Sequence, residues 1–105
     1  MQIDREPQDR VFDDMDGVFV VTTEDGVAFR LDMDERLVTR TVAVRAGLRA
    51  MLDSESAVLV AVATCRVGAP MVLLIDRNVP RVLFTRRTSG TVLSVNQVSR
   101  TPLPQ

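Results

Sequence analysis

The sequence predicts an all-β protein, either a small antiparallel barrel or a two-layer sandwich of about seven short strands, with at most one short helix. Three observations indicate this class. β-Branched residues gather in short runs, apolar and polar side chains alternate with a period of two, and Gly, Pro and Asp separate the runs. The chain has 105 residues, 46% of them hydrophobic, which fits one compact domain.

The domain organisation follows from where apolar residues are scarce. Residues 1–16 are rich in charge and are predicted to form an acidic N-terminal arm, held to the body at Phe12. Residues 17–95 are predicted to form a single β domain, and residues 96–105 a C-terminal tail that contains Pro102 and Pro104.

The clearest element is a three-stranded antiparallel meander over residues 17–43. The run Val18–Thr23 is followed by Asp25-Gly26, a turn signal, because these residues tolerate positive φ. In the return strand, one face carries only apolar side chains: Val27, Phe29, Leu31 and Met33. A second reversal at Asp34-Glu35 leads to a third strand over residues 36–42.

After residue 43, the spacing of the apolar residues along the chain changes. Val44, Leu48, Met51 and Leu52 have the spacing of one helical face, which predicts a short helix over 44–53 and a turn at 53–56. The three valines between 57 and 65 favour a strand there, and its uninterrupted apolar character predicts burial on both faces. A strand at 71–75 and a hairpin of 81–85 with 91–95 complete the prediction.

The absent residue types exclude several mechanisms. The chain has no His and no Lys, so it has no imidazole base, no Ser-His or Cys-His pair and no Schiff-base lysine. The single Cys65 cannot form an intramolecular disulfide or a cysteine zinc site, and it is predicted to be a small buried hydrophobic residue. We therefore predict no enzyme activity, no catalytic residue and no cofactor.

Two acidic groups, residues 13–16 and 32–35, are candidates for a Ca²⁺ or Mg²⁺ site or for paired catalytic carboxylates. Their spacing does not match a calcium-binding loop, and Asp is common in turns because it bonds to its own backbone. No metal site is predicted.

Charge is divided along the chain. Residues 1–35 contain eleven acidic residues and three Arg, a net charge of −8, whereas residues 36–105 contain ten Arg and three acidic residues, a net charge of +7. The two halves either neutralise one another within one sheet system or form opposed charged faces that orient a partner or stack copies of the chain.

These features predict a protein-interaction module that associates with itself or with another protein through a sheet edge. The third strand supplies the expected interface residues Val38, Arg40 and Val42, because the runs over residues 38–44 and 57–74 carry more apolar surface than a small barrel easily buries. A homo-oligomer is expected.

The alternative is a nucleic-acid-binding barrel that uses Arg81, Phe84, Arg86 and Arg87, since Arg contacts phosphates and an aromatic ring can stack on a base. An isoelectric point near 5.3 opposes this reading, as does the expectation that Phe84 belongs to the core.

No signal peptide is recognisable, and the longest apolar run, Ala57–Ala63, is far shorter than the roughly 20 residues of a membrane helix. We expect a cytoplasmic protein with no membrane contact. The use of Arg in place of Lys, with abundant Val, Ala and Asp, is typical of a high-GC genome such as that of an actinobacterium or one of its phages.

Overall fold

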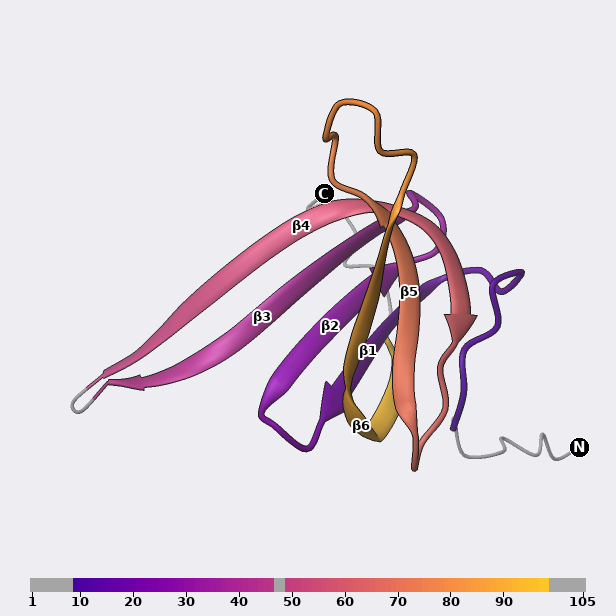
Figure 1. Cartoon of the computed structure of the whole chain (residues 1–105). Coiled ribbons are helices and arrows are strands. Elements are labelled where there is room, and N and C mark those ends of the chain that lie inside the picture. Colours follow the sequence, from indigo (N-terminus) through magenta and orange to yellow (C-terminus); the bar gives the residue numbers. More distant parts are fainter. Residues whose placement is uncertain (1–8, 47–48, 99–105) are drawn as a thin grey trace, which may run out of the picture.

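The computed structural model describes residues 9–46 and 49–98, which form a closed antiparallel barrel of six strands (Figure 1). The strands are β1 (Val18–Thr23), β2 (Val27–Asp32), β3 (Leu37–Ala46), β4 (Arg49–Thr64), β5 (Pro70–Asp76) and β6 (Thr85–Val98). Each strand pairs with the next, and β6 pairs with β1 to close the barrel. The described residues contain no helix, and the predicted small all-β barrel is confirmed.

The meander of β1, β2 and β3 has the predicted order and reversals. In the first reversal, the Gly26 N–H donates to the Thr23 carbonyl oxygen at 3.1 Å, and Gly26 has φ +83°. Asp25 does not share the positive φ, so this is a three-residue loop with glycine in the left-handed position after the turn.

The interior of the barrel is filled by the apolar face of each strand. All four residues of the predicted apolar face, from Val27 to Met33, are buried, together with Phe19 and Val21 of β1 and Leu73 of β5. Alternation therefore predicted the core correctly where strands are regular.

The predicted helix over 44–53 and the turn at 53–56 are wrong. Residues 44–46 continue β3, residues 49–56 belong to β4, and the two strands pair from Leu37↔Val58 to Ala46↔Arg49. The apolar spacing that resembles a helical face comes from residues on two facing strands of one hairpin. A short helix with Gly47 at its centre is intrinsically weak, and continuous cross-strand pairing outweighs it.

The prediction that residues 57–65 are buried on both faces is also wrong. Val58 and Val60 are exposed on the outside of the barrel, whereas Leu59, Val62 and Cys65 are buried. Register shifts at 59/61 and 62/64 produce this spacing of three, because each bulge resets the alternation of the strand.

The predicted hairpin of 81–85 with 91–95 is wrong as well, so the strands number six rather than seven. Residues 81–84 belong to the loop between β5 and β6, and Thr85–Val98 is one long strand. The first half of β6 pairs with β5 and the second half with β1. β6 extends past residue 96, where the C-terminal tail was expected to begin.

No helix with the length and apolarity required to cross a membrane occurs in residues 9–46 and 49–98.

Candidate interaction edge and arginine-lined pocket

The longest strands form a hairpin that projects from the barrel (Figure 1). β2 pairs with β3 only as far as Val42, and β5 pairs with β4 only from Val58 onward. Within the described residues, Ala43–Ala46 therefore pair only with β4, and Arg49–Ala57 pair only with β3. The outer edges of this hairpin offer backbone N–H and C=O groups to an added strand.

The other end of β4 is covered by the chain itself. The Val11 N–H donates to the Cys65 carbonyl oxygen at 2.9 Å, and the Val67 N–H donates to the Asp9 carbonyl oxygen at 2.8 Å. Val11 is buried in the core, while Phe12 is exposed and lies against the Arg10 guanidinium. The expectation that Phe12 holds this segment is wrong, because the neighbouring Val11 does so.

The predicted interface residues lie at the base of the hairpin, where β3 is paired on both sides. Val38 is 5% exposed and faces the interior, and Arg40 is half-buried beside it. Val42 occupies the last position that pairs with β2, and its side chain lies outside the described residues. The open edge of the described structure is on β4 and on the outer part of β3.

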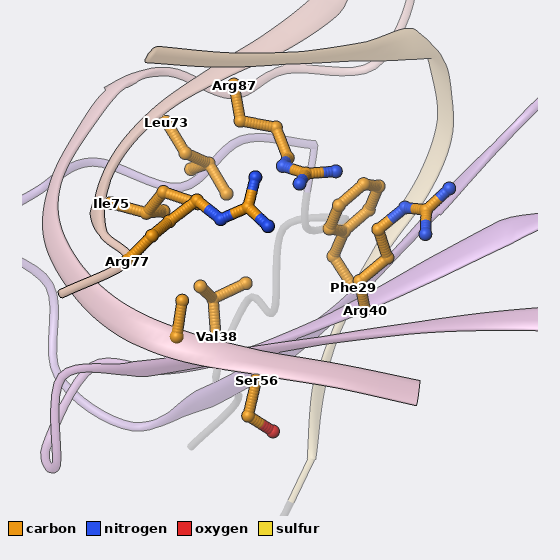
Figure 2. Close-up of a pocket in the computed structure, with 9 residues that line it drawn as sticks. Phe29, Val38, Arg40, Ser56, Leu73, Ile75, Arg77 and Arg87 are labelled. Atoms are coloured by element: carbon orange, nitrogen blue, oxygen red, sulfur yellow. The ribbon is translucent and has the colours of Figure 1, made fainter. Parts of the chain in front are cut away.

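A cavity of about 190 Å³ opens beside Val38 at the mouth of the barrel. Three arginines from different elements reach it: Arg40 from β3, Arg77 after β5 and Arg87 from β6. The other described lining residues are Phe29, Val38, Ser56, Ala57, Leu73 and Ile75. Figure 2 shows the guanidinium groups of Arg77 and Arg87 extending into the middle of the pocket, with Arg40 at its side next to Phe29.

The residues predicted to bind nucleic acid are divided between two places. Arg81 and Phe84 lie in the loop of residues 77–84, and Phe84 is 48% exposed, so the expectation that it belongs to the core is wrong. Arg86 is exposed on β6, whereas the next residue, Arg87, lines the pocket. Successive residues of a strand face opposite sides, so these four side chains do not share one surface.

The same loop exposes four apolar side chains, of which Val82, Leu83 and Phe84 were predicted to lie in a strand. Leu83 is 86% exposed, and Val79, Val82 and Phe84 are also exposed. Four exposed apolar residues on one short loop are typical of a contact surface rather than of an inert turn.

The single cysteine belongs to the core. Cys65 is 3% exposed, and burial raises the pKa of its thiol to about 11, which confirms the prediction that it is a buried small residue. Among the described residues, no group of three or more Cys, Asp or Glu side chains is arranged to hold a metal ion.

Comparison of the chain with models of known protein families, with curated proteins and with solved structures gives no match. The fold and the site thus define a class in structural terms alone. It is a small closed β-barrel with a projecting open-edged hairpin and a basic pocket at its mouth.

Proposed function

We propose that the protein is a non-enzymatic protein-interaction module that associates with a second copy of itself through the open edge of β4. The observation that carries this proposal is the pairing pattern of Arg49–Ala57, which have β3 on one side and no strand of the described chain on the other. An exposed strand edge of this length readily pairs with another chain unless something covers it.

The sequence of this edge is complementary to itself. In an antiparallel pair with its two-fold axis at Leu52, Arg49 of one copy lies opposite Glu55 of the other, and the two Leu52 residues face each other. Opposite charges in directly opposed positions contribute roughly 0.2–1 kcal/mol each, and the two-fold axis doubles every such pair. A register centred on Asp53 would instead place two carboxylates against each other.

A site-directed cross-link tests this register. In Leu52→Cys the two thiols lie in opposed positions, with Cα atoms about 4.5–5.5 Å apart, which is within the range of a disulfide. In the matched control Ser54→Cys the two thiols are four residues out of register, about 13 Å apart. Cys65 is buried and does not compete.

We expect a dimer in light scattering at micromolar concentration, and rapid oxidation of Leu52→Cys to a covalent dimer on non-reducing gels. Ser54→Cys should cross-link at least tenfold more slowly. A wild-type protein that remains monomeric up to millimolar concentration overturns the proposal, as does equal cross-linking of the two variants.

A second candidate function, nucleic-acid binding, is supported by three exposed side chains that lie close together in the sequence, Arg81, Phe84 and Arg86. If the protein binds nucleic acid, a labelled oligonucleotide should bind with an affinity that falls steeply as the salt concentration rises. Phe84→Ala should weaken this binding. Absence of binding at 50 mM salt eliminates it.

A further inference from the structure

The loop between β5 and β6, residues 77–84, projects beyond the ends of these strands (Figure 1). Leu83 is almost fully exposed, and Val79, Val82 and Phe84 each leave nearly half of their surface in water. Leaving apolar surface in water is unfavourable, and the cost is removed when another apolar surface covers it. Four such residues on one projecting loop indicate a contact surface.

The loop holds these side chains on a preformed turn. The Val82 N–H donates to the Val79 carbonyl oxygen at 3.1 Å, and the two residues between them are Pro80 and Arg81, which has φ +70°. This is the pattern of a type II turn, in which the third position has positive φ and usually holds Gly. A loop that is already ordered in the free protein loses little conformational freedom when it binds a partner.

The charge around the apolar residues has a single sign. Residues 77–87 contain four Arg and no Asp or Glu. Of these arginines, Arg81 directly precedes residues 82–84 and Arg86 closely follows them, and both are exposed. The aliphatic stem of Arg can lie along apolar surface while its guanidinium group binds an anion. A partner that complements this loop is therefore apolar inside and negatively charged at its surface.

An anionic lipid bilayer has this layered arrangement, because its phosphates lie above its acyl chains. Nucleic acid supplies negative charge and flat bases for Phe84, but it has no hydrocarbon region for Val79, Val82 and Leu83. A protein partner would need a cleft shaped to a projecting loop, whereas fluid lipid accepts the side chains without one. The observations therefore favour a membrane surface.

We propose that the loop of residues 77–84 binds the surface of an anionic membrane. Leu83 and Phe84 enter the boundary between headgroups and acyl chains, Arg81 and Arg86 bind lipid phosphates, and the barrel stays outside the bilayer. The expectation of no membrane contact rested on the lack of a spanning segment and of a signal peptide, and a peripheral contact needs neither. The loop is separate from the open edge of β4, so this proposal does not depend on self-association.

The chain contains no Trp and no Tyr, so one introduced tryptophan reports only on its own surroundings. Phe84→Trp places this reporter on the loop. The matched control Leu93→Trp places it at an exposed apolar position of β6 beyond Thr91, which pairs with Pro70 at the opposite end of β5 from the loop. The probe is a vesicle of two-thirds phosphatidylcholine and one-third phosphatidylglycerol.

We expect the emission of Phe84→Trp to shift to shorter wavelength and to be quenched by brominated acyl chains, with half-saturation at about 0.1–1 mM lipid, as suits a contact no stronger than one acyl chain. Leu93→Trp should show neither change. Vesicles of phosphatidylcholine alone should bind at least tenfold more weakly, because they lack the negative surface charge.

Two arginine variants test the charge. Arg81→Gln should weaken binding to the anionic vesicles roughly fivefold in co-sedimentation, whereas Arg66→Gln, an exposed position before β5, should change it less than about twofold. Equal losses in these two variants, an unchanged spectrum of Phe84→Trp at 5 mM lipid, or equal responses of the two tryptophan variants would each overturn the proposal. A response of Phe84→Trp to an oligonucleotide but not to vesicles would assign the loop to nucleic acid instead.

Discussion

The Asp13 carboxylate accepts a hydrogen bond from the backbone N–H of Val62 at 2.8 Å. The same Oδ1 atom accepts from the Arg36 guanidinium at 2.9 Å, and a second Arg36 nitrogen donates to the Asp13 carbonyl oxygen at 2.8 Å. One aspartate thus joins the segment before β1, the turn after β2 and the exposed margin of β4. It satisfies a strand-edge donor that would otherwise be open to water or to another chain.

Replacing Asp13 should therefore destabilise the barrel. We expect Asp13→Ala to lower the free energy of unfolding by about 1–2 kcal/mol, because it removes a charge-assisted acceptor that is itself about half exposed. The neighbouring Asp14→Ala is the control and should change stability by less than about 0.5 kcal/mol. Urea denaturation followed by circular dichroism measures both, and equal effects would contradict the assigned role.

The same contacts predict a pH dependence. The Val62 N–H and then the Arg36 guanidinium lower the pKa of Asp13 below its usual range. The folded state therefore holds its proton less tightly than the unfolded state, so the stabilisation is present above about pH 4 and is lost as the pH falls through the folded pKa. Asp13→Asn keeps an acceptor oxygen but cannot titrate.

The difference in stability between wild type and Asp13→Asn should accordingly shrink as the pH is lowered from 5 to 2. Urea midpoints measured across this range provide the test. Parallel stability curves for the two proteins would show that Asp13 is not linked to acid unfolding.

The first half of the fold was predictable from sequence because its strands are regular. Alternation from Val27 to Met33 reports one buried face, and the turn at Gly26 needs only local information. The hairpin of β3 and β4 was missed because Val44 and Met51 are cross-strand partners, a relationship that sequence spacing alone cannot distinguish from a helical face. The bulges in β4 change which of its side chains face inward, so the alternation in the sequence did not show which valines are buried.

The pocket could not be found in the same way. Arg40, Arg77 and Arg87 are separated in sequence, and only strand register and barrel closure bring them together. The sequence does show a positively charged C-terminal half. This indicates the sign of the charge but not where in the fold the arginines gather.

A second stability prediction concerns the turn between β2 and β3. Asp32 is 4% exposed, and its Oδ1 accepts from the backbone N–H groups of Asp34 at 3.1 Å and Glu35 at 2.9 Å. We expect Asp32→Ala to cost about 1–3 kcal/mol because it leaves these donors without the carboxylate. Asp32→Asn retains an oxygen acceptor and should lower the free energy of unfolding clearly less in the same denaturation experiment. The reverse order would contradict the role of the Asp32 side chain as the acceptor in this turn.

The thiol of Cys65 should react slowly while the protein is folded. Burial raises its pKa to about 11, and each pKa unit above the ordinary value lowers the thiolate fraction at pH 8 about tenfold. We expect labelling by Ellman's reagent to be at least 100-fold slower in buffer than in 8 M urea. Comparable rates would show that the end of β4 opens readily, against the contacts that Val11 makes there.

The four phenylalanines of this chain provide the sharpest test of which apolar residues form the core. Phe19 is 1% exposed inside the barrel, whereas Phe84 lies in the loop before β6 with about half of its surface open to solvent. Phe19→Ala should lower the free energy of unfolding by about 3–5 kcal/mol, because it removes a buried ring and leaves a cavity. Phe84→Ala should change it by less than about 0.5 kcal/mol, since a side chain already in water loses little packing when truncated.

Thermal and urea unfolding of the two variants, each carried out on the same oligomeric species as the wild type, measure the contrast. A large loss in Phe84→Ala would mean that the loop packs onto the barrel or onto a second copy, and its apolar residues would then not be available as a free contact surface.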